Sequence, residues 1–237
     1  MVPIANTPVG SSKSKDDPDC NSRAVTPPVR VAVIEDDERL RRALVFQLDC
    51  VGFEVVAHSS AEEFLKVPDT SAFDCIIVDN FLPRMNGLQL QAELHRSVPF
   101  ASIVFISGHG DLSLGMHAMR NGAVDFLEKP LDEETLVNSI IRGADLTRNR
   151  RAEHAQRIEV ERRFGALTPR EREVFALITT GLLNKQVGAE LGTTERTVKA
   201  HRERVMSKMK ADSLADLVRM SGILQLRSAW VRNEHSG

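Results

Sequence analysis

The chain has 237 residues, of which 42% are hydrophobic and 27% are charged. This length corresponds to one large or two modest domains. The composition indicates a soluble globular protein and excludes a membrane protein, because no apolar run approaches the roughly 20 residues that span a bilayer. No secretory signal is recognisable, so we expect a cytoplasmic protein. The three cysteines form no C-x-x-C pair and are expected to be ordinary packing residues.

Charge is distributed unevenly along the chain. Residues 1–28 contain 3 basic and 3 acidic side chains, residues 29–147 contain 10 and 19, and residues 148–237 contain 18 and 11. The basic last part favours a nucleic-acid partner, although solvated charged faces give the same counts. The first 28 residues hold five of the ten prolines and no aromatic residue, which predicts a disordered tail.

Short apolar runs alternate with amphipathic stretches throughout residues 29–147. The runs predict strands over residues 29–35, 53–58, 73–79, 101–107 and 123–128. The stretches predict helices over residues 38–50, 61–66, 88–97, 112–121 and 132–146. Because parallel strands need a crossover helix between them, the alternation indicates an α/β fold with a doubly wound five-stranded parallel sheet. Ligands of such sheets bind at the carboxyl ends of the strands.

The remaining sequence predicts a small all-α domain. Residues 148–165 are mostly charged and predict a helical linker. Residues 166–226 begin with a capping box, Thr168 to Glu171, and contain four helical patterns. These patterns predict helices over residues 170–181, 183–192, 194–209 and 213–224. Residues 227–237 are expected to be a C-terminal tail.

Polar side chains of a particular kind follow four of the predicted strands. The first strand runs into the acidic residues 35–37, the third ends in Asp79, the fourth ends in Ser107, and the fifth runs into Lys129. Converging carboxylates need a counter-ion, and oxygen ligands suit Mg²⁺ or Mn²⁺. Each residue taken alone is explained equally well as a loop residue or helix cap. Together they are the groups that phosphoryl transfer uses.

The stretches that carry these residues are VAVIEDDERLRRAL, IIVDNFLPRMNG, IVFISGHGD and GAVDFLEKP. They resemble the receiver domain of two-component response regulators, a CheY-like, flavodoxin-like fold, over about residues 30–147. The resemblance implies that Asp79 is the phospho-accepting nucleophile. It implies a Mg²⁺ cofactor held directly by Asp37, directly or through water by Asp36, and by the backbone carbonyl of Phe81.

The same resemblance assigns roles around the phosphoryl group. Ser107 donates to the new phosphoryl oxygens and Lys129 pairs with them. Phe126 is the aromatic residue that turns inward when the hydroxyl moves, although a core role fits it equally well. The bond between Lys129 and Pro130 is expected to be cis, which is feasible because X-Pro bonds carry a small cis penalty.

The predicted helix over residues 194–209 has two different faces. Val198, Val205 and Met209 define its inward face. The outward face is polar and mostly basic, and it consists of Arg196, Lys199, Ala200, Glu203 and Ser207. With the preceding short helix, residues 184–209 indicate a helix-turn-helix. A helical docking domain with a solvated charged face is the alternative.

The run ALTPREREVFALITTGLLNKQVGAELGTTERTVKAHRERVMSKM resembles the LuxR-type helix-turn-helix of the NarL/FixJ response regulators, nearest the FixJ branch. The resemblance places residues 194–209 in the major groove of DNA. Lys199, Ala200 and Glu203 suit contacts with bases. The candidates for contacts with phosphate are Lys185, Thr194, Arg196, Thr197 and Arg204.

These features predict a transcription factor controlled by phosphorylation of Asp79. Its implied partners are a sensor histidine kinase, promoter DNA and a second copy of the chain. RNA polymerase is a further candidate. The resemblance to FixJ-like regulators implies that residues 111–127 form the dimer face. Leu214, Leu217 and Val218 form either a second dimer seam or part of the small core.

Two alternatives come from other classes. A Mg²⁺-dependent phosphatase or phosphotransferase also uses an aspartyl nucleophile, but haloacid-dehalogenase-like enzymes carry a second Asp where Phe81 stands here. A phosphate-independent DNA-binding regulator is the other alternative. The full set of receiver residues argues against it.

Overall fold

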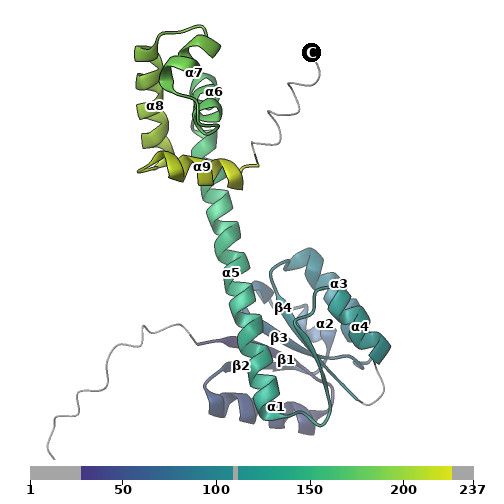
Figure 1. Ribbon diagram of the computed structural model, residues 1–237. Coiled ribbons are helices and arrows are strands. Elements are labelled where there is room, and N and C mark those ends of the chain that lie inside the picture. Colours follow the sequence, from purple (N-terminus) through teal and green to yellow (C-terminus); the bar gives the residue numbers. More distant parts are fainter. Residues whose placement is uncertain (1–27, 109–111, 226–237) are drawn as a thin grey trace, which may run out of the picture.

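Two bodies of different architecture lie at the ends of one long helix, α5 (Glu133–Gly165), in the computed structural model (Figure 1). The structure describes residues 28–108 and 112–225. The tails expected over residues 1–28 and 227–237 lie outside the described residues, apart from Pro28. The two bodies are the α/β part and the helical part that the sequence predicts.

The first body is built on a five-stranded parallel sheet. Its strands are β1 (Arg30–Ile34), β2 (Glu54–His58), β3 (Cys75–Asp79), β4 (Ser102–Ser107) and β5 (Asp125–Glu128). The order is β2-β1-β3-β4-β5, and each neighbouring pair is parallel. This confirms the doubly wound, flavodoxin-like sheet. The direction of winding changes between β1 and β3, which is where such sheets place their ligands.

Among the residues that the structure describes, four α-helices besides α5 belong to this body. They are α1 (Glu38–Val51), α2 (Ala61–Phe64), α3 (Gly87–Ser97) and α4 (Leu112–Arg120). Helix α2 ends two residues earlier than the sequence predicts. Residues 65 and 66 form a turn. Pro68 prevents the helix from extending through Val67, because a proline disfavours helical conformation in the residue before it. A short 3₁₀ helix, η1 (Thr70–Ala72), follows and was not predicted.

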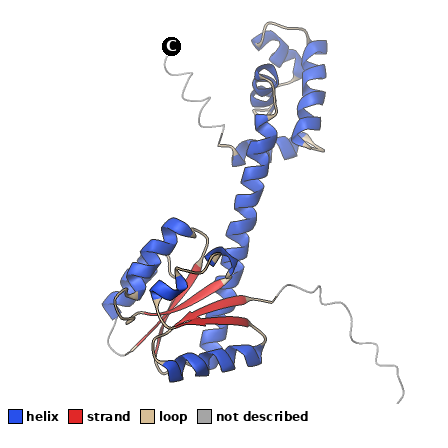
Figure 2. Cartoon of the chain, turned by 180° about the vertical axis from the view of Figure 1, so that it is seen from behind, coloured by secondary structure: helices blue, strands red, loops and turns tan. Residues whose placement is uncertain are grey.

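Helices cover both faces of the sheet. Ala32 and Ile34 point toward α2, α3 and α4, whereas Val31 and Val33 point toward α1 and α5. Figure 2 shows the sheet in red between these helices. All five residues of β3 are buried, as expected for a central strand of a parallel sheet.

Helix α5 joins two segments that the sequence analysis kept apart. The helix expected over residues 132–146 and the linker expected over residues 148–165 form one helix of 33 residues. Ion pairs one turn apart, such as Arg157 with Glu161, support its exposed part. The last turns contribute Val160 and Phe164 to the core of the second body. The charged segment is therefore a structural part of both bodies.

The second body contains α6 (Pro169–Ile178), α7 (Asn184–Glu190), α8 (Glu195–Met209) and α9 (Leu214–Ile223). Val198, Val205 and Met209 are buried, so the predicted inward face of α8 is confirmed. Leu217 is fully buried in the same core, which favours a core role for it over a dimer seam. Gly188 makes the turn after α7 tight, since a Cβ there would lie 2.9 Å from the carbonyl oxygen of Thr193.

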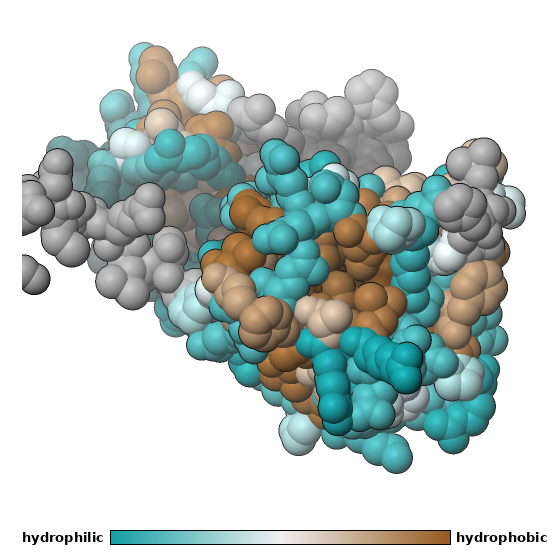
Figure 3. All heavy atoms as spheres, turned by 90° about the horizontal axis from the view of Figure 1, so that it is seen from below, coloured by the Kyte–Doolittle hydropathy of each residue, from teal (hydrophilic) through white to brown (hydrophobic). Residues whose placement is uncertain are grey.

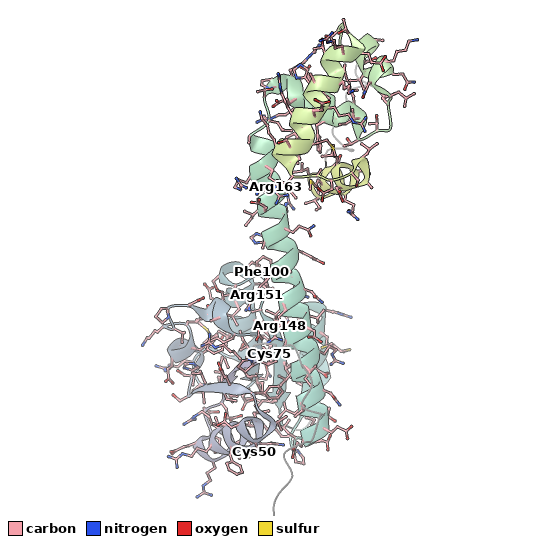
Figure 4. The ribbon with its side chains drawn as sticks, turned by 90° about the vertical axis from the view of Figure 1, so that its left-hand side faces the viewer. Cys50, Cys75, Phe100, Arg148, Arg151 and Arg163 are labelled. Carbon is pink, nitrogen blue, oxygen red and sulfur yellow. The ribbon has the colours of Figure 1, made fainter. Side chains whose placement is uncertain are left out.

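The cysteines occupy different environments. Cys75 is buried in β3, and burial raises the pKa of its thiol to about 12. Cys50 is exposed on α1 and is therefore not the packing residue that was expected (Figure 4). Cys20 lies outside the described residues.

Candidate functional site

The functional side chains of the first body gather at the carboxyl edge of the sheet. Asp79 is the last residue of β3 and Ser107 the last of β4, whereas Glu35 and Lys129 directly follow β1 and β5. Parallel strands end at the same edge, so neighbouring strands bring these residues together although they are far apart in the sequence. The side chains of Asp79 and Glu35 are buried, with 5% and 1% of the residue exposed.

Lys129 joins the two buried carboxylates. Its Nζ donates to Asp79 Oδ2 at 2.8 Å and to Glu35 Oε2 at 2.9 Å. Burial lowers the pKa of Lys129, but the hydrogen bonds and charges of both carboxylates outweigh burial and raise it above its ordinary value. The pKa of Glu35 is raised, chiefly by burial and further by the charge of Asp79, against the opposing effect of Lys129. The ammonium therefore remains charged between the two acids.

Three carboxylates form an acidic cluster. Among the described residues, the group that could hold a metal ion consists of Glu35, Asp36 and Asp79, whose ligand oxygens lie within 4.8 Å of one another. One ammonium stands against three carboxylates, so the cluster carries excess negative charge. This hard oxygen donor set fits Mg²⁺, which takes one or two carboxylates together with water and phosphate.

Asp37 is not part of this cluster, which corrects the expected set of ligands. Its Oδ1 accepts hydrogen bonds from the backbone N–H groups of Leu40 and Arg39, at 3.2 and 2.8 Å. These bonds lower the pKa of Asp37 and make it the N-cap of α1. Glu35 takes the place that the sequence analysis gave to Asp37. The sequence feature that could have identified Glu35 as a member of the cluster is its position directly after the apolar run of β1.

The backbone around Asp79 supports its second oxygen. The N–H of Phe81 donates to Asp79 Oδ1 at 3.0 Å, so both carboxylate oxygens of Asp79 are held. The side chain of Phe81 points outward and is 57% exposed. Arg41 of α1 donates to the backbone carbonyls of Glu35 and Asp36, at 2.7 and 3.1 Å, and this fixes the loop that carries the acids.

The hydroxyl and the aromatic residue of the predicted site lie on the neighbouring strands β4 and β5, where Ser107 pairs with Glu128 and Phe126 pairs with Phe105. Ser107 is fully buried, and its carbonyl accepts from the backbone N–H of Lys129 at 2.8 Å. The ring of Phe126 stacks on Phe105, with centroids 6.2 Å apart. A Cβ at Gly115 of α4 would lie 3.1 Å from the Phe126 ring. The peptide bond between Lys129 and Pro130 is cis, as expected.

The predicted DNA-facing residues lie on the surface of the second body. All eight are exposed: Lys185, Thr194, Arg196, Thr197, Lys199, Ala200, Glu203 and Arg204. Helix α8 runs along one side of this body (Figure 1). Thr194 caps α8 by accepting from the N–H of Thr197, and the two hydroxyls lie 2.9 Å apart. Arg202 donates to Asn184 at 3.3 Å and ties α8 to α7.

An ion pair between an exposed lysine and a buried glutamate, which the sequence analysis missed, holds α8 against α6. Lys208 Nζ donates to Glu171 Oε2 at 2.6 Å, and only 2% of Glu171 is exposed. Burial raises the pKa of Glu171, but hydrogen bonds from Lys208 and Thr168 outweigh burial and lower it. Glu171 was visible in the sequence only as part of a capping box, because its partner lies 37 residues further along.

Comparisons with known proteins agree with this architecture. Residues 31–141 match the family model of the response regulator receiver domain, and residues 165–221 match that of the bacterial regulatory proteins of the luxR family. Nodulation protein W of Bradyrhizobium diazoefficiens is 44% identical over 194 residues, which cover 82% of this chain and 86% of the relative. The transcriptional regulatory protein FixJ of Azorhizobium caulinodans is 38% identical, over 81% of this chain and 90% of the relative.

Two solved structures resemble the chain over most of its length. The response regulator StyR has a TM-score of 0.73 and 37% identity, over 83% of this chain and 99% of its own. Full-length FixJ from B. japonicum has a TM-score of 0.53 and 33% identity, over 85% and 99% of the two chains.

The receiver and the LuxR-type domain define a two-component response regulator that binds DNA and regulates transcription. Within that class, the chain belongs to the NarL/FixJ family and stands close to its FixJ branch. None of the described helices is long and apolar enough to cross a membrane.

Proposed function

We propose that a sensor histidine kinase phosphorylates Asp79 and that this phosphorylation controls binding to promoter DNA. The observation that carries the proposal is the buried Asp79 carboxylate, held by Lys129 and by the N–H of Phe81 beside two further acids. A regulator that binds promoter DNA acts in the cytoplasm, where the chromosome lies. It catalyses only its own phosphorylation and dephosphorylation.

The residues of the acidic edge supply the parts of phosphoryl transfer. An oxygen of Asp79 attacks the phosphorus of a donor phosphohistidine or small acyl phosphate, and the bond from phosphorus to the donor breaks. Glu35, Asp36, Asp79 and the carbonyl of Phe81 are the proposed Mg²⁺ ligands. The ion would neutralise charge that develops on the transferred group. Lys129 pairs with the phosphoryl oxygens.

The switch follows from the change in charge at Asp79. A phosphoryl group adds acceptor oxygens and negative charge, which draw in the hydroxyl of Ser107. The carbonyl of Ser107 accepts a hydrogen bond from the backbone N–H of Lys129, which directly follows β5. Phe126 lies in β5, and its ring packs against Gly115 of α4. We therefore expect phosphorylation to move α4 against β5.

This movement provides the proposed dimer face over residues 111–127. Met116 and Met119 of α4 are exposed apolar side chains on this segment, and the receiver exposes apolar residues among hydrophilic ones elsewhere as well (Figure 3). Asp111 lies outside the described residues. A dimer binds two half-sites more tightly than a monomer binds one, because the second contact is effectively intramolecular.

Helix α8 is the proposed recognition helix. Lys199, Ala200 and Glu203 face base edges, where they suit guanine, the methyl group of thymine, and cytosine. The proposed phosphate contacts are Lys185, Thr194, Arg196, Thr197 and Arg204. RNA polymerase is a proposed partner at promoters, since DNA-bound regulators act on transcription there.

The first test is intact mass and size-exclusion chromatography after incubation with Mg²⁺ and acetyl phosphate. The wild-type chain is expected to gain one phosphoryl group and to elute as a dimer. Asp79→Asn should do neither, because the nucleophile is gone. Asp69→Asn, a change of an exposed acid that caps η1, is the matched control and should behave as wild type. An adduct or a dimer in Asp79→Asn would contradict the proposal.

The same samples separate the alternatives. A phosphatase would turn over phosphomonoesters with Mg²⁺, but Phe81 stands where such enzymes carry a second acid. A phosphate-independent regulator would bind DNA equally well with and without phosphodonor. We expect neither result.

A further inference from the structure

The middle of α5 is held against the receiver by a buried carboxylate. Asp74 directly precedes β3, at the edge of the sheet opposite to the acidic cluster, and is 7% exposed. Its Oδ2 accepts from Arg148 Nη2 at 3.0 Å and from the N–H of Arg30 at 3.1 Å, and its Oδ1 accepts from Arg151 Nη1 at 3.2 Å. Such charge-assisted bonds are stronger than neutral ones.

Further contacts surround this pair of arginines. Arg151 also donates to the backbone carbonyls of Ser71 and Phe73. The rings of Phe100 and His154 lie 4.7 Å apart, centroid to centroid. Figure 4 shows Phe100 near Arg148 and Arg151 of α5, where the helix leaves the receiver. We call Asp74, Arg148 and Arg151 the receiver clamp.

The other end of α5 is attached to the recognition helix. Arg163 Nη1 donates to the carbonyl oxygen of Met209, the last residue of α8, at 3.0 Å. Arg163 is itself held by Glu159, 2.8 Å away on the preceding turn. Lys208 of α8 donates to the carbonyl of Ala166, directly after α5, at 3.3 Å. The end of α8 therefore moves with the end of α5.

Between the two attachments, α5 crosses from one body to the other. Residues 155–158 are helical and exposed. The side chain of Arg157 pairs with Glu161 of the same helix, at 2.8 Å. A continuous backbone helix with local ion pairs transmits both distance and rotation, since each residue adds about 1.5 Å and about 100°.

We propose that α5 is a rigid arm whose length and helical phase set the position of α8 relative to the receiver, and so select the separation of the two DNA half-sites. Asp74 and Arg163 are then positioning residues for DNA binding. They act through α5 and not by contact with DNA. This inference rests on the proposed function, in which the phosphorylated dimer binds paired half-sites.

The rigidity of the arm is tested without DNA by dipolar electron paramagnetic resonance on the full chain. Spin labels are placed at the native exposed Cys50 of α1 and at Glu190→Cys of α7, in a Cys20→Ser background. The distance distribution between labels should be narrow with Asp74 intact and broad in Asp74→Asn. Asp145→Asn removes an exposed acid from α5 and is the control, expected to stay narrow. Equally broad distributions in all three chains would overturn the proposal.

The phase of the arm is tested by insertions between Ala155 and Gln156. The probe is a duplex selected from a random-sequence pool by the phosphorylated wild-type chain. Two added alanines rotate α8 by about 200° relative to the receiver, whereas seven rotate it by about 700°, close to two full turns. We expect the two-residue insertion to weaken dimer binding about 100-fold, the order of an avidity loss.

The seven-residue insertion restores the phase but lengthens each arm by about 10 Å. It should therefore recover tight binding on duplexes with a wider separation of the same half-sites. The Asp74→Asn variant should bind duplexes with several different half-site separations about equally well. Equal binding of one duplex by all the chains would overturn the rigid arm while leaving the phosphorylation switch intact. Failure of the wild-type chain to dimerise with phosphodonor would instead count against the proposed function.

Discussion

Asp36 and Asp37 are adjacent acids with different work. Asp36 lies in the acidic cluster, whereas the side chain of Asp37 caps α1 by accepting hydrogen bonds from its first backbone N–H groups. The difference arises because β1 ends and α1 begins within four residues, so a shift of one position exchanges a ligand for a cap. The sequence alone shows a run of three acids and does not show where that exchange falls.

Alanine substitutions separate the two roles. Asp36→Ala should weaken Mg²⁺ binding at least about tenfold, a loss seen even for outer partners of a metal. It should leave stability without Mg²⁺ unchanged or higher, because it removes repulsion from the cluster. Asp37→Ala should keep Mg²⁺ affinity and lower the urea midpoint, since α1 loses its cap. Calorimetric Mg²⁺ titration and urea unfolding measure both quantities, and a strong loss of affinity in Asp37→Ala would restore it as a ligand.

The other receiver positions could be read from the sequence for a physical reason. Asp79 and Ser107 end long apolar runs, and Lys129 closely follows one, so the strand ends fix their places. Parallel topology then brings those ends to one edge. Glu35 was harder to assign because it directly follows the last residue of β1, and its side chain is longer than those of Asp36 and Asp37. Its 2.9 Å contact with Lys129 and its place in the acidic cluster show that it belongs to the site.

At the scale of the elements, α5 shows where sequence patterns are weakest. The charged segment after residue 147 has too few apolar residues to reveal its packing partners. Its contacts are made instead by arginines that reach a buried carboxylate and by two apolar residues, Val160 and Phe164, in its final turns. Partners so distant along the chain leave no local signal. The helices with regular apolar faces, such as α1 and α8, were predicted almost to their ends.

The ion pair between Lys208 and Glu171 attaches α8 to α6, and its strength depends on the protonation state of Glu171. Glu171→Gln keeps the capping box, which accepts Gln, but removes the charge that binds Lys208. We expect the free energy of unfolding to fall by about 1.5–3 kcal/mol at neutral pH, as for a hydrogen bond to a charged group. Glu173→Gln, on the same helix with an exposed side chain, is the control and should change stability little.

The pH dependence has a definite sign. The folded-state pKa of Glu171 is lowered from its ordinary value of 4.5, so its stabilisation is fully present above that value. It is lost as the pH falls through the lower folded-state pKa. The advantage of the wild-type chain over Glu171→Gln should therefore shrink in acid below 4.5. Urea unfolding of both chains at neutral and acidic pH measures it, and an advantage that grows in acid would contradict the assignment.

At the scale of the whole molecule, charge is divided between the two bodies. Residues 29–147 carry nine more acids than bases, and residues 148–237 carry seven more bases than acids. The acidic body suits a cation site and is repelled by DNA, whereas the basic body suits the phosphate backbone. The rigid arm proposed for α5 would therefore also keep the acidic body at a distance from the DNA that α8 is proposed to read.

Salt dependence distinguishes the contacts of the basic body. Arg196→Gln removes a proposed phosphate contact, so it should weaken binding by a similar factor on all sequences and reduce the slope of log affinity against log salt by about one. Lys199→Gln removes a proposed base contact and should relax the preference at one base pair, at a cost of about 1–3 kcal/mol on the preferred sequence. Arg157→Gln removes an arginine of α5 that pairs with Glu161 and is the control, because its cation lies in the arm between the two bodies. Titrations of a selected duplex and its point variants over a range of salt separate these results. A slope reduced equally by all three changes would mean that DNA senses the total charge of the arm and the second body and not the exposed face of α8.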